Sequence, residues 1–296
     1  MPYQEAILNF LTAAWLGSVG ACIGSFLNVV AYRVPRGESV VRGGSACPQC
    51  GHAIRAKHNV PVVSWLILRG KCRDCSAPIP ARYVLVEVAV GLMFFMLAYA
   101  ELFSGGANLP GRPINFFPGA ALNVWYPRWP LIGAYLYHCT LLALLVTIAL
   151  MDSDRVRTPK PFLAAGVAVG VASQLTWWPK LFFAWSEKDI PYAPLLYGGG
   201  VILSMVFGLL LSLTPPYQRA KKLRGSYPAT VFSPILIGAY LGYVAAVQIF
   251  IVSLPIALAL WLATRRSVSF TTAAAYAIPT ATLLFLCFWK QLAPFL

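Results

Sequence analysis

The sequence predicts an all-α polytopic membrane protein with seven or eight transmembrane helices and a small cytoplasmic four-cysteine module of the zinc-ribbon kind between helices 1 and 2. Hydrophobic residues make up 59% of the 296 residues and charged residues only 11%, and the mean hydropathy is +0.69. A soluble core could not bury so much apolar side chain, so the expected solvent is a bilayer. Two Cys-x-x-Cys pairs, in a polar segment near the N-terminus, predict the module.

Long apolar runs give the expected positions of the transmembrane helices, because a spanning helix needs about 20 mostly apolar residues. The runs are Ile7–Ala31, Tyr83–Phe103, Pro130–Met151, Pro161–Trp178, Leu195–Leu213, Ser233–Ala263 and Phe270–Trp289. The run Ser233–Ala263, with Ser253 and Pro255 near its middle, is long enough for one span with a preceding helix or for two short spans. We therefore divide the chain into a first transmembrane helix (1–32), a module (33–82) and a helical bundle (83–296).

The distribution of basic residues predicts that the N-terminus lies outside and the four-cysteine module in the cytoplasm. Lysine and arginine are concentrated in segment 33–82 and recur at 155–160 and 219–224, whereas the connections between these segments hold few. Basic loops remain on the cytoplasmic side. The first apolar run has neither a basic segment before it nor a small-residue cleavage site, which indicates a retained helix. The net charge of +14 is expected to face membrane lipid, and no nucleic-acid motif accompanies it.

The strongest metal signal is the set of four cysteines Cys47, Cys50, Cys72 and Cys75. Two Cys-x-x-Cys pairs separated by residues 51–71 are typical of a tetrahedral thiolate site for Zn²⁺. Gly51 follows the first pair and helps the backbone to turn around a metal. Because four cysteines fill the coordination sphere, the predicted zinc is structural.

The alternative for these cysteines is a pair of redox dithiols, but a reducing cytoplasm favours metal binding over disulfides. The remaining cysteines, Cys22, Cys139 and Cys287, lie in apolar runs and are expected to be small buried hydrophobic residues. No internal repeat is apparent.

Three runs around the module resemble the type IV prepilin peptidases, namely Gly24–Gly37, Asn59–Cys72 and Pro80–Glu87. Motif order and spacing agree over residues 20–90. The resemblance implies an intramembrane aspartic endopeptidase of the bacterial cytoplasmic (inner) membrane. Such enzymes remove the leader peptides of type IV pilins and of type II secretion pseudopilins, and many then methylate the new N-terminus with S-adenosylmethionine. Prepilins or pseudopilins are thus the implied partners, and S-adenosylmethionine is a candidate cofactor.

Aspartic proteolysis needs two carboxyl groups that share a water molecule, one ionised and one protonated. Asp152 and Asp154 are the candidate catalytic residues, and the resemblance gives the leading role to Asp152. The other interpretation is a solvated pair of acids at a helix end, facing Arg155 and Arg157. The family continues with an apolar-Pro-Asp step, where this chain has Lys160 in place of the aspartate.

The second catalytic aspartate of the family has no counterpart here, because Thr230 occupies the position that the resemblance assigns to it. The carboxyl side chains of the chain are Glu5, Glu38, Asp74, Glu87, Glu101, Asp152, Asp154, Glu187 and Asp189. Glu187 and Asp189 are expected on the outer side, about 30 Å from Asp152. Asp154 stands two residues from Asp152, about 200° around a regular helix. Glu87 is expected either to approach Asp152 or to pair with Arg82.

Three functions from different classes therefore remain open. The first is a prepilin peptidase with an altered pair of acids. The second is a lapsed homologue, a possible pseudoenzyme, that binds pilin-like helices or scaffolds an assembly without cutting, which Thr230 and Lys160 favour. The third is an enzyme that only methylates, for which the sequence has no glycine-rich dinucleotide fingerprint.

Overall fold

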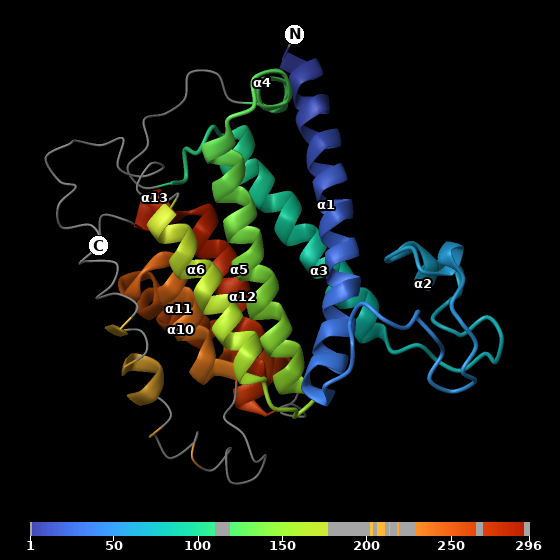
Figure 1. The fold of residues 1–296 in the computed structure, drawn as a ribbon. Coiled ribbons are helices and arrows are strands. Elements are labelled where there is room, and N and C mark those ends of the chain that lie inside the picture. Colours follow the sequence, from blue (N-terminus) through green and yellow to red (C-terminus); the bar gives the residue numbers. More distant parts are fainter. Residues whose placement is uncertain are drawn as a thin grey trace, which may run out of the picture.

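The computed structural model of the protein is a bundle of helices with the four-cysteine module beside it (Figure 1). The structure describes residues 2–109, 119–176, 229–264 and 269–292, together with a few residues between 202 and 218. Within these residues every regular element is a helix, and the extended pairing is limited to two isolated β-bridges in the module. The all-α fold class predicted from the sequence is confirmed.

The longer helices are α1 (Pro2–Arg33), α3 (Ala81–Leu97), α5 (Trp129–Ser153), α6 (Lys160–Thr176), α10 (Ala229–Leu241), α11 (Tyr243–Ala263) and α12 (Phe270–Cys287). Short elements are the 3-10 helices η1 (Val34–Arg36) and η2 (Ala56–His58), the π-helix η3 (Ala98–Phe103), and α2 (Val63–Ile67), α4 (Ala120–Trp125) and α13 (Trp289–Leu292).

Five helical stretches in the described part of the chain are long and apolar enough to cross a membrane: Tyr3–Arg36, Ala81–Phe103, Trp129–Ser153, Ala245–Ala263 and Phe270–Cys287. Two shorter apolar helices, Lys160–Ser173 and Val231–Leu241, lie at other predicted spans. The predicted span Leu195–Leu213 lies outside the fully described residues. The protein is therefore a polytopic membrane protein, as the composition predicts.

A row of glycines lets α1 and α3 pack closely against each other. A Cβ atom added at Gly20 would lie 2.8 Å from the Phe94 ring and 2.9 Å from the carbonyl oxygen of Val90, and one added at Gly24 would lie 3.0 Å from Cα of Glu87. Small residues at such interfaces are how membrane helices approach each other. Because residue 20 meets residue 94 and residue 24 meets residue 87, the two helices are antiparallel.

The ends of the helices define two ends of the bundle. The end that carries the module holds the C-terminus of α1 and the N-terminus of α3, and we call it the module end. Arg82 of α3 pairs with Asp154 after α5, so α5 finishes at the module end and α6 begins there. Cβ atoms added at Gly166 and Gly170 would meet Leu236 and Tyr240, so α10 runs parallel to α6, away from the module end.

The run Ser233–Ala263 forms two helices, and the break falls at Gly242 and not near Ser253 or Pro255. Gly242 has φ of 88°, a conformation that side chains disfavour and glycine adopts freely. α11 then returns antiparallel to α12, since Trp261 contacts Phe270 and Ala257 packs with Ala274 and Ala277. Of the two helices, α11 contains a stretch long enough to cross a membrane, Ala245–Ala263, whereas the apolar helix Val231–Leu241 is shorter.

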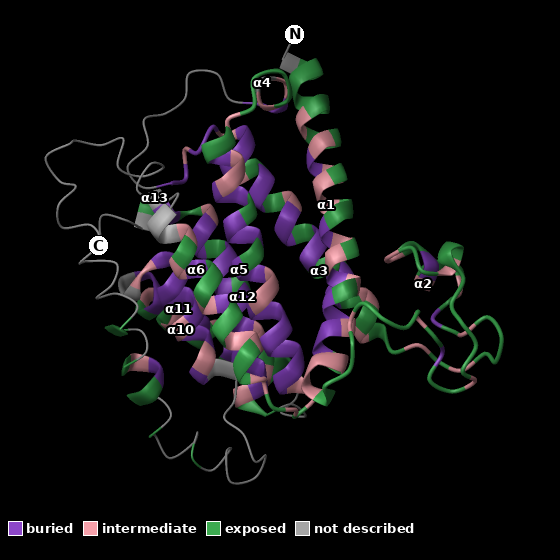
Figure 2. Cartoon of the chain, in the orientation of Figure 1, coloured by how far each residue is buried: buried purple, intermediate pink, exposed green. Residues whose placement is uncertain are grey.

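Burial is concentrated on α5 and α12, which form the centre of the bundle (Figure 2). In contrast, α1 exposes large apolar side chains along its length, among them Ile7, Phe10 and Trp15. Exposed apolar residues on a long helix are expected where the solvent is lipid. The core therefore fixes α5, the helix that carries the candidate acids.

Candidate functional site

The module contains two knuckles that have the same backbone geometry, over residues 45–54 and 70–79. An offset of 25 positions superimposes their hydrogen bonds, with Cys72 equivalent to Cys47. In the first knuckle, the N–H of Cys47 donates to the carbonyl oxygen of His52 (3.0 Å), that of Gly51 to Cys47 (2.9 Å) and that of Ile54 to Ser45 (2.7 Å). In the second, the N–H of Cys72 donates to the carbonyl oxygen of Ala77 (2.8 Å), that of Ser76 to Cys72 (2.9 Å) and that of Ile79 to Gly70 (2.7 Å). The structure thus contains a repeat that sequence analysis missed, because few side chains repeat besides the cysteines.

The turn of each knuckle requires a left-handed residue directly after the second cysteine. Gly51 has φ of 71° and Ser76 has φ of 59°. Glycine adopts this conformation without steric cost, whereas a residue with a Cβ atom pays about 1 kcal/mol or more. The expectation for Gly51 is confirmed, and the second knuckle achieves the same turn with serine.

The four cysteine sulfurs form one compact cluster that can hold a metal ion. The Sγ atoms of Cys47, Cys50, Cys72 and Cys75 all lie within 4.8 Å of one another, and those of Cys47 and Cys75 are 3.8 Å apart. A tetrahedral ion with metal–sulfur bonds of about 2.3 Å separates its sulfurs by about 3.8 Å. The donor set and the spacing therefore fit a tetrahedral thiolate-bound metal.

The thiols of the cluster differ in acidity. The backbone N–H groups of Cys50 and Gln49 lower the pKa of Cys47 to about 6. The N–H of Ala77 favours the thiolate of Cys75, but loss of water and the neighbouring thiols outweigh it and raise the pKa of Cys75 to about 12. The N–H of His52 likewise favours the thiolate of Cys50, but burial and the nearby charge of Cys47 outweigh it and raise the pKa of Cys50. One thiolate thus makes the ionisation of its neighbours less favourable, and a bound cation removes the repulsion between the thiolates.

The affinity for metal is expected to fall steeply as the pH is lowered. At pH 7 the pH is above the pKa of Cys47, so that thiol is ionised, whereas Cys50 and Cys75 keep their protons because their pKa values are raised. A metal ion that binds all four sulfurs must therefore displace at least two protons. Each displaced proton lowers the affinity about tenfold per pH unit of acidification, giving at least about 100-fold between pH 8 and pH 7. Below about pH 6 the protonation of Cys47 adds to the loss. Partition of Zn²⁺ between the protein and a chromogenic chelator at pH 6, 7 and 8 measures this, and a constant affinity contradicts it.

Arg33, the last residue of α1, organises the chain that leads into the first knuckle. Its guanidinium donates to the carbonyl oxygens of Ser39, Arg42 and Gly43 through Nη1, and to that of Gly44 through Nη2, at 3.2–3.3 Å. These carbonyl groups thereby gain a common donor in a segment without regular structure. The first transmembrane helix thus shapes the module directly.

Glu87 of α3 holds the segment between the two knuckles. Its Oε2 accepts a hydrogen bond of 2.7 Å from the N–H of Val62. Val62 has φ of 63° and ψ of −54°, and the N–H of Val63 donates to the carbonyl oxygen of Pro61 at 2.6 Å. This geometry is a classic γ-turn, which is rare and strained, above all for a β-branched residue. The expected pairing of Glu87 with Arg82 is therefore wrong.

Arg82 pairs instead with Asp154, through Nη1 to Oδ1 and through Nη2 to Oδ2, the latter at 2.7 Å. Both residues are partly exposed. A bidentate guanidinium–carboxylate pair fixes both partners in orientation. Asp154 therefore ties the end of α5 to the start of α3, and the solvated pair of acids facing Arg155 and Arg157 does not form.

Asp152 lies in the last turn of α5 and is only 6% exposed. It points into the bundle, while Asp154 two residues later turns to Arg82, as their separation around a helix predicts. A carboxyl group buried at the edge of a membrane is costly and is expected to have a function. Thr230 lies in the first turn of α10, which begins at the module end, the same end as Asp152. Glu187 and Asp189 lie outside the described residues.

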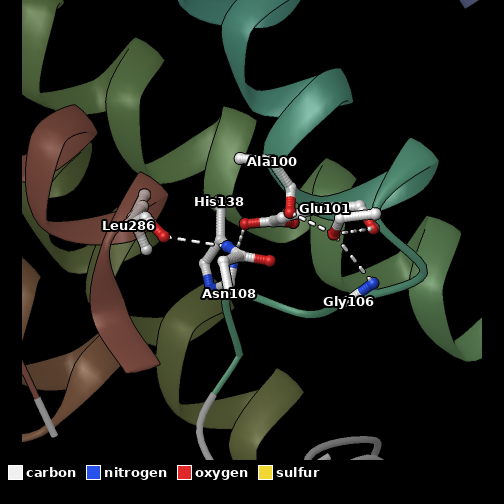
Figure 3. A network of polar contacts seen from close by, with 7 residues as sticks. Ala100, Glu101, Gly106, Asn108, His138 and Leu286 are labelled. Carbon is white, nitrogen blue, oxygen red and sulfur yellow. Dashed lines mark hydrogen bonds and ion pairs between the residues drawn. The ribbon is translucent and has the colours of Figure 1, made fainter. Parts of the chain in front are cut away.

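A second buried polar group lies deeper in the bundle, between Glu101 of the π-helix η3 and His138 of α5 (Figure 3). Oε1 of Glu101 lies 2.6 Å from Nδ1 of His138, and both side chains are 0% exposed. Asn108 donates from Nδ2 to the carbonyl oxygen of Leu286 at 2.8 Å, and the N–H of Gly106 donates to the carbonyl oxygen of Glu101 at 2.8 Å. His138 precedes Asp152 by 14 positions, about 21 Å along α5, so the two sites are separate.

The sequence pattern alone predicts no role for Glu101 or His138. The available signal was an acid and a histidine in two apolar runs, since ionisable residues within spans usually pair with one another. The pairing itself depends on the π-helical turn at Ala98–Phe103, which rotates Glu101 relative to the preceding α-helix.

Of the other cysteines, Cys139 is buried as predicted, Cys287 is partly buried, and Cys22 is exposed, contrary to the prediction.

Comparison with known protein families gives a match to a model described as the Bacterial Peptidase A24 N-terminal domain. The match covers residues 18–101, which comprise the second half of α1, the whole module, α3 and the first four residues of η3. The residues described above that fall within it include the four cysteines, Arg33, Arg82, Glu87 and Glu101. No solved structure matches the chain.

Curated relatives agree with the family model. A prepilin leader peptidase/N-methyltransferase of Myxococcus xanthus is 37% identical over 162 residues, covering 55% of this chain and 40% of that protein. The protein with the same description from Neisseria gonorrhoeae is 39% identical over 105 residues, covering 27% of this chain and 37% of its own length. A type 4 prepilin-like proteins leader peptide-processing enzyme of Escherichia coli is 41% identical over 106 residues, covering 30% and 39%. The matches thus span about two fifths of these relatives, and through residues 18–101 this chain is related to the type IV prepilin peptidase family.

Proposed function

We propose that this protein processes type IV prepilin-like precursors, removing their leader peptides at the cytoplasmic face of a bacterial inner membrane. The observation that carries the proposal is Asp152, a carboxyl group that is 6% exposed at the module end of α5. Asp152 lies on α5, and the pair between Asp154 and Arg82 holds the end of this helix against α3. Arg82 belongs to the matched domain. The relatives described as leader peptidases support the substrate class.

In this proposal Asp152 is the catalytic residue and activates water at the leader junction. Asp154, paired with Arg82, keeps the last turn of α5 in position. A second carboxyl group is required to complete an aspartic peptidase. Glu87 of α3 is the acid that the sequence offers for this role, but its Oε2 already accepts a hydrogen bond from the N–H of Val62.

The finer features of the proposal concern orientation, metal and methylation. The basic residues of segment 33–82 support an N-terminus outside and a module in the cytoplasm, next to anionic lipid. Zn²⁺ is the proposed metal of the module, where four thiolates fill its tetrahedral coordination and make the site structural. N-methylation of the cleaved product, with S-adenosylmethionine as donor, follows from the N-methyltransferase descriptions of the relatives.

The second candidate function is binding without cleavage. It is favoured by Thr230, which stands in the first turn of α10 where the resemblance assigns the second aspartate, and by the absence of any Asp or Glu after Asp189. Such a protein would engage pilin-like precursors through the module and its spans, or scaffold their assembly. Methylation without cleavage is a separate, third candidate, which the N-methyltransferase descriptions of the relatives support.

Leader removal from a prepilin co-expressed in a host without its own peptidase distinguishes the two functions. The proposed function predicts that the wild-type chain shortens the prepilin by its leader, as measured by mass spectrometry. If the wild-type chain leaves the leader intact and Thr230→Asp restores cutting, the protein is a binding homologue. Thr230→Asn is the matched control, because it has the shape of aspartate without the charge.

A further inference from the structure

The short helix α2 of the module exposes large apolar side chains although it belongs to the polar part of the sequence. Val63, Leu66 and Ile67 are 50%, 60% and 70% exposed, and Val60 just before them is 46% exposed. Scattered exposed apolar residues are ordinary, but a contiguous group marks an interaction surface. The helix belongs to the segment between the two knuckles, and this segment contributes no cysteine to the metal site.

Glu87 shows how deep α2 lies relative to the membrane. The N-terminal neighbour of α2, Val62, is hydrogen-bonded to the Glu87 carboxylate. Glu87 follows the first residue of α3, Ala81, by six positions, which is about 9 Å along the axis of this transmembrane helix. The start of α2 therefore lies level with the first two turns of the candidate span Ala81–Phe103. In Figure 1 the module lies beside the lower half of α1, and α2 is at the upper edge of the module.

The polar groups around α2 are satisfied locally, as a low-dielectric environment demands. Ser64 is buried, accepts from the N–H of Val60 at 2.9 Å and donates to the carbonyl oxygen of Lys57 at 3.4 Å. Trp65 donates from Nε1 to the carbonyl oxygen of Ile79 at 3.2 Å. The side chains left facing outward from α2 are thus the apolar ones.

Charge and continuity indicate what covers this surface. Exposed basic residues flank α2 in the sequence, namely Arg55, Lys57, Arg69, Lys71 and Arg73. On α3, near Glu87, Tyr83 and Leu85 are 45% and 65% exposed, and they belong to a membrane span. A helix with an apolar face and basic flanks is the pattern of an interfacial segment on anionic lipid.

We propose that α2 is an interfacial membrane anchor, whose residues Val63, Leu66 and Ile67 insert into the anionic leaflet next to α3. Glu87 is the positioning residue that sets its depth through the N–H of Val62. The anchor keeps the metal module against the bilayer surface, within reach of the module end of α5. The proposal rests on the transmembrane position of α3 and holds whether or not the chain cuts leaders.

Photocrosslinking in lipid tests the anchor directly. The full-length protein carries p-benzoylphenylalanine in place of Ile67 and is reconstituted in nanodiscs of phosphatidylglycerol and phosphatidylcholine. The same substitution at Leu85 is the lipid-facing control, and at Gln49, exposed on the turn of the first knuckle, it is the water-facing control. Illumination is expected to give lipid adducts at residue 67 at a level similar to residue 85 and several-fold above residue 49, as measured by mass spectrometry.

Adducts at residue 67 no more frequent than at residue 49 would overturn the proposal. A crosslink from residue 67 to a co-reconstituted prepilin, in place of lipid, would also overturn it and identify a substrate surface. Retention of metal by each variant reports that the module is folded, and the same substitution at Leu66 replaces that at Ile67 if metal is lost. Glu87→Gln, which weakens the bond to Val62, is expected to lower the yield of lipid adducts at residue 67.

Discussion

Replacing Cys72 by serine is expected to abolish metal binding and to leave segment 45–79 without a fixed fold. In the structure the two knuckles are held by turns and by single β-bridges, Ala46 with Ala53 and Lys71 with Pro78, and the turn at Ser76 is left-handed. Structural zinc in small modules contributes about 10–16 kcal/mol near pH 7, which these few bonds do not replace. Metal content by plasma mass spectrometry and tryptic cleavage at Arg55 and Lys57 measure the loss.

Cys22→Ser is the matched control for this experiment. Cys22 is exposed on α1 and does not belong to the sulfur cluster. This variant is expected to keep a full equivalent of metal and wild-type resistance to trypsin. Full metal occupancy in Cys72→Ser would show that the four sulfurs do not form one site.

Replacing His138 by leucine is expected to destabilise the bundle by about 3 kcal/mol, since it leaves the buried Glu101 carboxyl group without the ring nitrogen that contacts it at 2.6 Å. Glu101 and His138 are both 0% exposed, so water cannot compensate for the loss. Replacing Glu101 by leucine as well removes the carboxyl group that His138→Leu leaves without a partner. The double variant with leucine at both positions is therefore expected to be more stable than His138→Leu alone.

Reversible unfolding in mixed micelles measures these differences as free energies of unfolding. Thr140→Leu is the control on the same helix, because Thr140 is exposed and its hydroxyl donates to the carbonyl oxygen of Leu136 in its own helix. Its free energy of unfolding is expected to stay within about 0.5 kcal/mol of wild type. Additive effects of the two leucine substitutions would contradict direct coupling of Glu101 with His138.

The sequence predicted those parts of the fold that depend on local pattern. Apolar length gave the positions of α1, α3, α5 and α12, because a bilayer imposes a minimum length on each span. The spacing of the cysteines predicted the metal cluster, since two tight turns present all four sulfurs whatever the rest of the chain does. Local chemistry determined both results, and both were confirmed.

Contacts between distant residues were not predictable from pattern. The pairing of Arg82 with Asp154, in place of Glu87, depends on where α5 ends relative to α3, and no periodicity encodes that register. The break at Gly242 was missed because Pro255 was the more obvious interruption, although α11 continues through it. The coupling of Glu101 to His138 depends on one π-helical turn. In each case tertiary packing, and not local preference, selected the partner.

Leader removal by variants at the two candidate acids is the most direct test of the proposal that Asp152 cleaves prepilin-like precursors. In the co-expression assay Asp152→Asn is expected to lower the rate of leader removal by about 10²–10⁴, the usual loss for a missing acid or base. Asp154→Asn, which only weakens the pair with Arg82, is expected to cost about tenfold or less. Cutting by Asp152→Asn at the wild-type rate would contradict the proposal.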